Sequence, residues 1–254
     1  MLAAISAAPR PANVYSPITN IQYALVQKDC AISSPLSVSD AYAATDRTVP
    51  TRIRRHASYD RELVHAILDA DYLCHLGFVR DGAPVVLPTL YARVGERLYV
   101  HGSAGSRPLR GAGEDTGLAV CLTVTHVDGL VLARSAIHHS INYRCVVVHG
   151  VARQVTDPVE RSAALDALID HIVPGRAADS RPANVKELAA TAVVALDLHE
   201  VSAKVRTGDP NDDPDDLALP YWTGVLPVTR TYGEPVPADD LDPSITVPGY
   251  LTER

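Results

Sequence analysis

The segment YLCHLGFVRDGAPVVLPTLYARV, residues 72–94, decides the fold of this chain. Its two halves are rich in strand-forming residues and flank Asp81-Gly82, a dipeptide that favours the positive-φ turns of β-hairpins. Gly95-Glu96 then turns the chain into RLYVHG, which predicts a third strand. Three consecutive strands joined by tight turns indicate antiparallel pairing, because a parallel pair needs a long crossover connection.

Four stretches further along the chain also have the composition of strands, with many Val, Leu, Thr and Tyr residues. Asp128-Gly129 predicts a tight turn between the first two of them. The four stretches are GLAVCLTVTHV (117–127), LVLARSAIHH (130–139), YRCVVVHGVARQV (143–155) and TAVVALDLHEVSAKVR (191–206), the last of which we interpret as one long strand.

Two amphipathic helices are predicted beside these strands. Residues 59–70 place apolar side chains at helical spacing, and Ser58 precedes them as a candidate N-cap. Residues 158–172 show the same periodicity. Strands joined by tight turns, with helices only between groups of strands, predict a mainly β protein of the α+β class, a small antiparallel barrel with flanking helices.

The pattern also divides the chain. Residues 1–56 show no sustained period and end in the basic stretch TRIRRH, so we expect an N-terminal arm that is partly irregular. We expect the barrel domain over residues 57–230 and a C-terminal tail over residues 231–254.

Composition excludes several classes of partner. The formal net charge of −7 disfavours nucleic acid, because neutralising phosphates needs a basic face. No apolar run approaches the ~20 residues of a membrane-spanning helix. The four cysteines, Cys30, Cys74, Cys121 and Cys145, lack the paired spacing of disulfide frameworks and zinc sites, which favours reduced thiols and a cytoplasmic location.

The loop in LYVHGSAGSRPLRGAG (98–113) is the strongest candidate for a binding site. Small residues expose backbone N–H groups, serine hydroxyls add donors, and Arg107 and Arg110 add permanent positive charge, which together suit one phosphate group. The alternative is an ordinary surface loop with solvated arginines. The spacing matches neither the Walker pattern nor the GxGxxG of dinucleotide-binding folds.

A second cationic position lies on the last predicted strand. Lys204 and Arg206 are two residues apart, so both side chains, together with Ser202, face the same side of the strand. They indicate either a charged rim of the barrel or a solvated edge strand.

The histidines offer no metal site. His138 and His139 are neighbours in a predicted strand and would point to opposite faces, so they cannot ligate one ion. His75 and His101 lie within apolar strands, where a hydrogen-bonded structural histidine is the common outcome. His101 is the better candidate for chemistry because it adjoins the Gly/Ser loop.

The order of these segments resembles one protein family. CHLGFVRDGAPVVLPTLYAR, RLYVHGSAGSRPLR, INYRCVVVHGVARQV, LHEVSAKVRTG and YWTGVLP look like the flavin-nucleotide-binding branch of the pyridoxamine 5'-phosphate oxidase-like superfamily, near the nitroimidazole reductase (Nim-type) proteins. The resemblance covers about residues 55–230. It implies a six-stranded antiparallel split β-barrel, a homodimer, and FMN bound in the groove between the subunits.

The resemblance also implies roles for single residues. His101 stands where a histidine is functionally important in Nim-type relatives and is the implied catalytic residue. The implied cofactor contacts are Pro88, Thr89 and Leu90 at the flavin ring, His101, Gly102 and Ser103 on the next strand, Ser106 and Arg107 at the phosphate, Tyr143, Arg144 and Lys204, and Trp222 as a cover from either subunit.

Two departures from the family pattern matter. The family loop usually carries lysine after the glycines, whereas this chain reads Ser-Arg-Pro there (106–108), so phosphate binding would rest on Arg107, with Lys204 as a second cation on the same phosphate. The C-terminal substrate arginines of true pyridoxamine phosphate oxidases are absent, so vitamin conversion is not expected.

Two classes of function follow. The first is an FMN-dependent oxidoreductase that passes electrons or hydride from NADH or NADPH to a small organic acceptor. The second is a non-catalytic protein that stores or senses flavin or haem, since split barrels host both uses. A deazaflavin-dependent reductase is a third reading. Turnover of a reduced nicotinamide cofactor separates the first class from the second.

Overall fold

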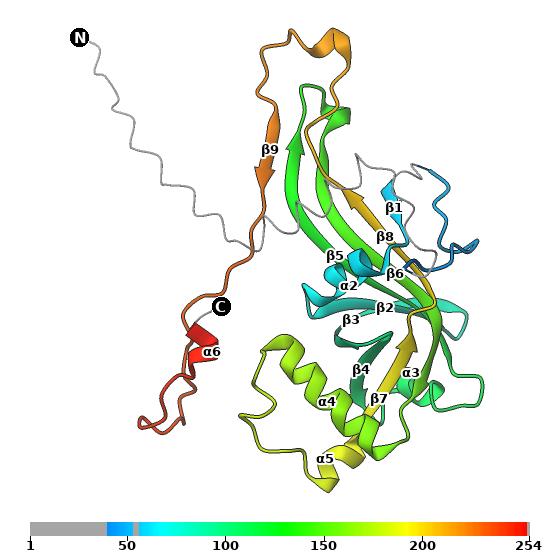
Figure 1. Cartoon of the computed structure of the whole chain (residues 1–254), viewed down its shortest axis with the longest axis vertical. Coiled ribbons are helices and arrows are strands. Elements are labelled where there is room, and N and C mark those ends of the chain that lie inside the picture. The colour runs from blue at the N-terminus through cyan, green and yellow to red at the C-terminus, as the bar shows by residue number, and fades with distance from the viewer. Residues whose placement is uncertain (1–39, 53–55, 253–254) are drawn as a thin grey trace. The chain divides into compact units, whose positions relative to one another are not determined.

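Antiparallel strands dominate the structure, a computed structural model that describes residues 40–52 and 56–252 (Figure 1). From Asp40 onward the chain forms one compact unit. Residues 1–39, most of the predicted N-terminal arm, lie outside the described residues. The described strands are β1 (Ala57–Ser58), β2 (Leu73–Arg80), β3 (Ala83–Val94), β4 (Arg97–Ser103), β5 (Leu118–Leu132), β6 (Ser140–Gln154), β7 (Thr191–Asp197), β8 (Glu200–Arg206) and β9 (Gly224–Pro227).

Six of these strands close into a ring. The pairing runs β5-β6-β7-β4-β3-β2 and returns to β5, with every pair antiparallel. This confirms the predicted six-stranded antiparallel split barrel. The hairpin that decides the fold has its predicted turn, in which Asp81 and Gly82 both adopt positive φ values of 52° and 77°.

Helices cover two sides of the ring. The described α-helices are α2 (Arg61–Asp69), α3 (Arg107–Gly111), α4 (Pro158–Ile172), α5 (Val185–Ala190) and α6 (Gly249–Thr252). The main core fills the inside of the barrel and the space between the barrel and α2. It includes the fully buried Tyr91, Leu98 and Ile67. A second cluster around Tyr99 and Val193 includes Ala164 of α4. Each large apolar side chain buried in this way contributes about 1.5–3 kcal/mol of transfer free energy.

The two main helices agree with the sequence, apart from one cap. The helix α4 has the predicted bounds. The helix α2 begins after Asp60, whose Oδ1 accepts a hydrogen bond from the backbone N–H of Leu63 at 2.7 Å, so the predicted N-cap at Ser58 is wrong. Ser58 lies in β1, where pairing with Ala203 of β8 fixes its backbone.

The predicted turn at Asp128-Gly129 is also wrong. The strand β5 continues through it with a β-bulge, and the chain turns later, where the 3-10 helix η2 (Ala136–His138) precedes β6. Tertiary contacts explain the difference. Asp128 accepts two hydrogen bonds from Arg144, and β9 packs so closely on Gly129 that an added Cβ would lie 2.9 Å from Val225.

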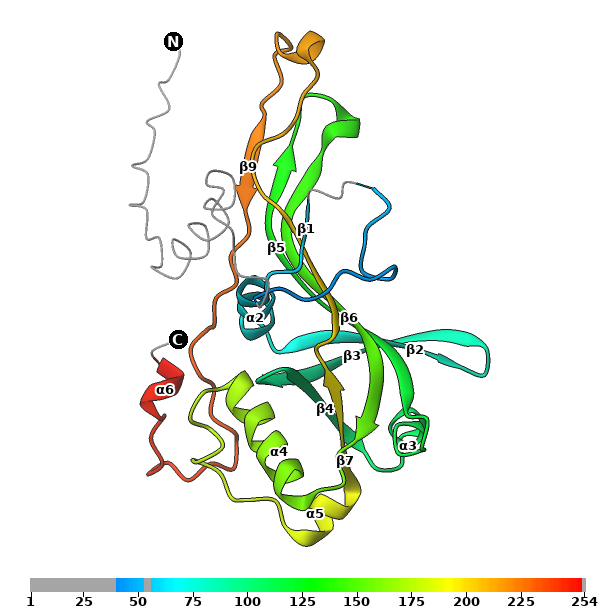
Figure 2. The same ribbon diagram turned by 45° about the vertical axis from the view of Figure 1, so that its right-hand side comes forward.

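The hairpin of β5 and β6 extends beyond the ring, with β8 on one side and β9 on the other (Figure 2). The predicted strand over 191–206 is therefore two strands. It breaks at the buried Leu198, whose N–H donates to the carbonyl oxygen of Glu96 at 2.9 Å. The strand β7 belongs to the ring, whereas β8 pairs with the extended part of β6.

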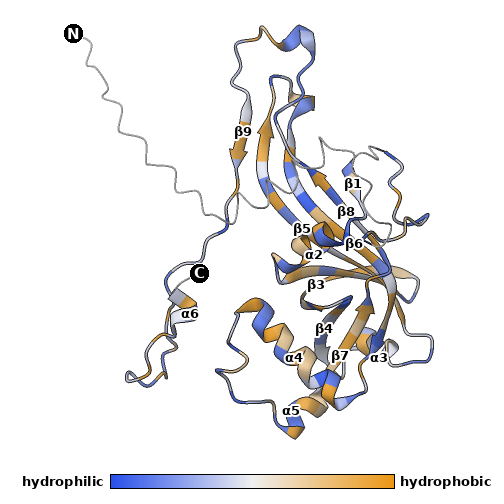
Figure 3. Cartoon of the chain, in the orientation of Figure 1, coloured by the Kyte–Doolittle hydropathy of each residue, from blue (hydrophilic) through white to orange (hydrophobic). Residues whose placement is uncertain are grey.

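Several large apolar residues are exposed along this extension, among them Ile137, Leu130 and Leu226. Hydrophobic and hydrophilic residues are interspersed along its strands (Figure 3). None of the helices in the described ranges is long and apolar enough to cross a membrane. Cys74, Cys121 and Cys145 are free thiols, and Cys30 lies outside the described residues.

Candidate functional site

One row of paired residues crosses five neighbouring strands on the outer face of the barrel. Pro88 pairs with His75, His75 with Thr123, Thr123 with Val147, and Val147 with Ser202. Directly paired residues point to the same side of a sheet, so all five side chains share one face. Several of the predicted site residues form two clusters, one toward each end of this face.

The first cluster lies on β3 and β4. Pro88 and Leu90 are on the outer face of β3, and the pairing of Tyr91 with Val100 places Leu90 beside His101 on β4. Ser103 follows on the same face of β4. Pro88 is exposed, and Leu90 and His101 are half-buried. Four of the predicted cofactor contacts therefore form one surface, which we call the β3–β4 platform.

Thr89 and Gly102 face the other side of the sheet. Thr89 pairs with Cys74, whose side chain is fully buried in the barrel core. Gly102 pairs with the buried Ala192, and a Cβ at this glycine would lie 2.8 Å from a methyl carbon of Leu109. Their side chains face away from the β3–β4 platform, so only their backbone could contact a ligand there.

His101 has an unusual environment. Its Nδ1 atom is buried and has no hydrogen-bond partner in the described part of the chain. Burial lowers the pKa of the imidazole below its usual value of 6.5. The ring is therefore neutral at neutral pH. A buried polar atom without a partner costs about 1–3 kcal/mol.

The Gly/Ser loop follows the β3–β4 platform directly. Ser106 occupies the N-cap position of α3, but its side chain makes no capping bond, which leaves the hydroxyl available. Arg107 begins α3, and its side chain lies outside the described part of the structure. Arg110 is exposed, as predicted.

The second cluster lies on β6 and β8. Lys204 pairs with Cys145, and its Nζ lies 5.9 Å from the centre of the Tyr143 ring. Among the described residues, no salt bridge involves Lys204. Arg206, on the same face, donates a hydrogen bond of 2.5 Å to Asn142.

The two clusters are far apart on one chain. Lys204 is opposite Cys145, whereas Gln154, nine positions further along β6, donates its N–H to Ala112 at the end of α3. Nine residues of strand span roughly 30 Å. The end of α3 and the position of Lys204 are therefore far apart on one chain.

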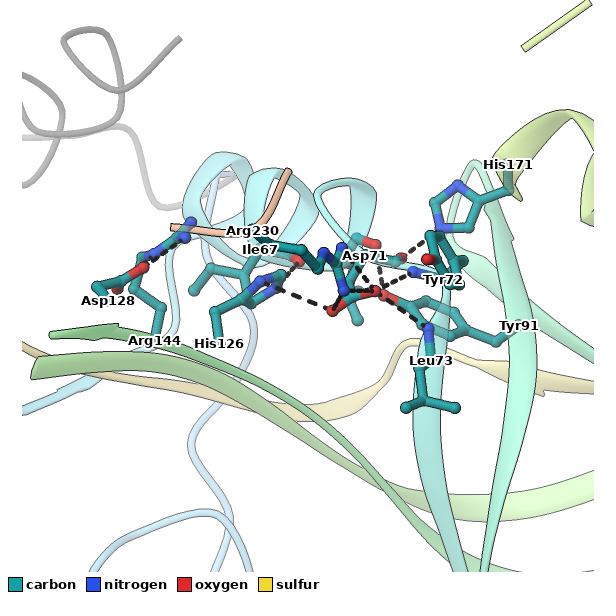
Figure 4. Close-up of polar contacts among 11 residues, drawn as sticks. Ile67, Asp71, Tyr72, Leu73, Tyr91, His126, Asp128, Arg144, His171 and Arg230 are labelled. Atoms are coloured by element: carbon teal, nitrogen blue, oxygen red, sulfur yellow. Dashed lines mark hydrogen bonds and ion pairs between the residues drawn. The ribbon is translucent and has the colours of Figure 1, made fainter. Parts of the chain in front are cut away.

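Arg144 does not join either cluster. Its guanidinium donates two hydrogen bonds of 2.9 Å to Asp128, on the face of β6 opposite to Tyr143 (Figure 4). Neighbouring residues in a strand face opposite sides, and this rule already separates Tyr143 from Arg144 in the sequence.

Asp71 is a polar hub that the sequence does not reveal. Its carboxylate accepts from the N–H of Tyr72 at 2.8 Å and from Arg230 at 3.0 and 3.1 Å (Figure 4). Its carbonyl oxygen accepts from His171 of α4 at 2.6 Å, and His126 of β5 lies 4.0 Å from the carboxylate. The hub joins β2, β5, α4 and the C-terminal segment.

Trp222 precedes β9, beside the extended hairpin, and His138 and His139 lie in the connection between β5 and β6. Trp222 is 68% exposed and packs back on Gly224, which is paired with Leu132 at the end of β5. It is therefore remote from the β3–β4 platform of its own chain.

His138 ends η2 rather than lying in a strand. His139 follows it, with its Nδ1 3.0 Å from a backbone oxygen, so the strand argument made for this pair was wrong. Within the described ranges, no group of three or more His, Cys, Asp or Glu residues could hold a metal ion.

Comparisons with known proteins point in one direction. The sequence profile of the family described as pyridoxamine 5'-phosphate oxidase matches residues 60–205. The flavocytochrome Anf3 from Azotobacter vinelandii is 39% identical, and the alignment covers 84% of this chain and 98% of that chain with a TM-score of 0.78. The FAD and heme binding protein from Mycobacterium smegmatis is 38% identical, with coverage of 78% and 96% and a TM-score of 0.74.

A third solved structure is more distant. The putative 5-nitroimidazole antibiotic resistance protein from Bacteroides thetaiotaomicron is 19% identical, with coverage of 59% of this chain and 86% of that chain and a TM-score of 0.48. Among curated protein sequences, none matches.

Proposed function

The chain belongs to the pyridoxamine 5'-phosphate oxidase family, and we propose that it binds a flavin between two copies of itself and uses it for oxidation–reduction. Two similar solved structures support the flavin, since one is named a flavocytochrome and the other a protein that binds FAD and haem. The sequence predicts FMN. The β3–β4 platform suits FMN and FAD equally, because both carry the same ring, side chain and first phosphate.

The half-buried His101 on the β3–β4 platform is the observation that carries this proposal. It lies on a surface formed by Pro88, Leu90 and Ser103, which offers apolar contact for a flat ring and one hydroxyl at its edge. A bound flavin supplies the hydride or electron transfer. The neutral His101 would orient a bound ring by a hydrogen bond through its other ring nitrogen, Nε2, which no hydrogen bond among the described residues engages, and could hold a proton there for a reacting group.

The proposed site needs a second subunit. Arg107 follows the platform, whereas Lys204 of the same chain lies roughly 30 Å away along β6. A homodimer that stacks the two outer faces brings Lys204 and Trp222 of one copy toward the platform of the other. The exposed apolar side chain of Val86, on the same face of β3 as Pro88, supports such an interface.

For the reaction, we propose that NADH or NADPH supplies the electrons and a small organic molecule accepts them. The family resemblance supports this choice of electron donor and acceptor. The exposed position of Pro88 also supports it, because a flavin ring bound against Pro88 would keep an edge accessible to a second substrate. Protein freshly purified and denatured should release a flavin. Steady oxidation of NADPH in the presence of an acceptor should depend on His101. Binding of flavin without any turnover would indicate a storage or sensing protein instead. Binding of a deazaflavin alone would indicate a deazaflavin-dependent reductase.

A haem beside the flavin is the second candidate, favoured by the names of the two similar structures. Haem iron needs an imidazole that is free of other bonds. His75 is exposed in the centre of the outer face, beside Pro88, and no hydrogen bond engages its side chain in the described part of the chain. A Soret band in the absorption spectrum that disappears in His75→Ala would support this candidate.

A further inference from the structure

A cavity of about 200 Å³ lies between residues 47–50 and the outer face of β6 and β8. Its floor includes Val147 and His149 of β6 and Ser202 of β8, and Val49 and Pro50 form part of the opposite wall. One water molecule occupies about 30 Å³ in the liquid, so the cavity has the volume of about seven waters. Pockets that hold a whole drug-sized ligand measure about 300–1,000 Å³. The cavity is therefore sized for a molecule with a single ring.

The segment that closes the cavity is held in place by measured contacts. Thr48 is buried, with 3% of its surface exposed, and its carbonyl oxygen accepts a hydrogen bond from the hydroxyl of Tyr59 at 3.1 Å. Arg47, one residue earlier, contacts Glu200 of β8. These contacts fix the position of the wall that follows them, residues 49 and 50.

The two cations of the lining lie toward opposite ends of the floor. Arg47 contacts Glu200, which pairs with His149, whereas Lys204 pairs with Cys145. Glu200 and Lys204 are four residues apart in β8, which is a separation of roughly 13 Å along the strand. An anion beside His149 is therefore held by Arg47, and Lys204 remains free for the flavin phosphate of the proposed function.

The Arg47 end of the cavity offers several hydrogen-bond donors. One nitrogen of Arg47 contacts Glu200, which leaves the other N–H groups of the guanidinium available. Burial, and then the positive charge of Arg47, lower the pKa of His149, so its ring is neutral at neutral pH and one of its nitrogens donates. Ser202 adds a hydroxyl, and the described lining includes no carboxylate. These groups suit a ligand group that accepts hydrogen bonds and carries a negative charge, as a carboxylate does.

Apolar surface completes the cavity, through Val49 and Pro50 on one side and Val147 on the other. We propose that this cavity binds a small aromatic carboxylate, with its ring between Pro50 and Val147 and its carboxylate at Arg47. This site is separate from the proposed flavin site, so it goes beyond the proposed function, and its test needs no flavin.

Calorimetric titrations with benzoate, benzamide and acetate test the proposal. Benzamide has the ring of benzoate without the charge, and acetate has the charge without the ring. We expect benzoate to bind at least tenfold more tightly than either, because its charge-assisted hydrogen bonds and its apolar contacts both contribute. Benzoate should also raise the pKa of His149, followed by NMR, because a carboxylate beside the imidazole offsets the charge of Arg47.

Three variants locate the ligand. Arg47→Gln should weaken benzoate binding by about 10- to 100-fold and leave benzamide binding unchanged. Arg52→Gln is the matched control, since Arg52 is an exposed arginine of the same segment outside the cavity lining, and it should bind benzoate as wild type does. Ser202→Phe fills the cavity from its floor and should abolish binding of benzoate and benzamide alike.

Several outcomes would overturn the inference. Benzoate that does not bind at millimolar concentration, or that binds no more tightly than benzamide, excludes a carboxylate site. Equal affinities for benzoate and acetate exclude recognition of the ring, and an Arg47→Gln variant with wild-type affinity places the ligand elsewhere. Displacement of benzoate by flavin or by NADPH assigns the cavity to that cofactor and leaves the proposed function standing. Binding of benzoate by a protein that takes up no flavin overturns the proposed function alone.

Discussion

Arg230 and Asp71 are 159 positions apart in the chain, and three hydrogen bonds of 3.0 to 3.1 Å join their side chains. The contact fixes the C-terminal segment against the start of β2, where Arg230 also lies 5.2 Å above the ring of Tyr72. The two partners differ in burial, since the side chain of Asp71 is 11% exposed and that of Arg230 is 53% exposed.

This difference in burial predicts that alanine substitutions at Asp71 and at Arg230 lower the free energy of unfolding by different amounts. Asp71→Ala removes the acceptor for Arg230 and for the N–H of Tyr72, and should lower the free energy of unfolding by roughly 2–4 kcal/mol. Arg230→Ala should cost about 1 kcal/mol or less, because its guanidinium is half-exposed and screened by solvent. Urea unfolding of both variants measures the two values. Equal losses would show that Asp71 acts only through Arg230.

The environment of His101 predicts how flavin binding depends on pH. Because burial lowers its pKa below 6.5, the ring is neutral above that pH, and flavin affinity should be flat between pH 7 and pH 8. The affinity should fall as the pH drops below 6.5 and His101 gains a proton. Folding stability should fall in the same direction, because the unfolded chain takes up this proton at a higher pH than the folded chain.

Flavin titrations of wild type, His101→Gln and the exposed-site control His199→Gln across this range check the prediction. His101→Gln should bind flavin about tenfold more weakly at pH 7.5 and lose the pH dependence, since one hydrogen bond is worth about 1 kcal/mol. A control variant that loses the same pH dependence would place the effect elsewhere.

Mixed dimers test whether Arg107 and Lys204 meet across the subunit interface. Each single variant, Arg107→Ala or Lys204→Ala, should bind flavin about 10- to 100-fold more weakly than wild type. A dimer of one Arg107→Ala subunit and one Lys204→Ala subunit carries one doubly damaged site and one intact site. It should therefore bind one flavin per dimer with wild-type affinity.

Arg110→Ala is the matched control for the mixed dimers, since this arginine is exposed in the same loop, and it should bind flavin normally. Mixed dimers with no high-affinity site would mean that each chain builds its own site. Light scattering that reports only the 27.2 kDa monomer would remove the basis of the experiment and contradict the dimer.

Trp222 offers a direct signal of flavin binding, because it is the only tryptophan of the chain and is 68% exposed. If Trp222 of one subunit covers the flavin of the other, adding flavin should quench most of its fluorescence. Tyr221 is exposed beside it, so a Tyr221→Ala variant serves as the control and should still be quenched. Binding of flavin without quenching would place Trp222 away from the site.

The sequence predicts the ring well, because local signals specify its strands. Asp81-Gly82 sets the first hairpin, and the helix over 158–172 has its observed bounds. The strand β9 escapes prediction, since four residues in a proline-rich segment form a strand only by pairing with β5. The bulge at Gly129 follows from that same pairing, which no local pattern reveals.

For the site, the segments chosen from the sequence remain a prediction, but the structure shows which of their side chains share one face. Alternation along a strand separates Leu90 from Thr89 and Tyr143 from Arg144, so this rule shows from the sequence alone that the side chains in each pair face opposite sides. The cavity under residues 47–50 could not have been found in this way. The cavity depends on the irregular segment 47–50. A contact between Arg47 and Glu200, 153 positions later in the chain, joins this segment to β8.

The closure of the ring has a consequence for synthesis of the chain. The strand β4 finds its second neighbour only in β7, through pairs such as Arg97 with Asp197, 100 positions further on. Until the ribosome has released β7, the edge of β4 is unpaired and open to pairing with other chains. Contacts between such distant residues also slow folding. In a nascent chain the edge of β4 therefore stays open until β7, about 90 residues further along, has also left the ribosome.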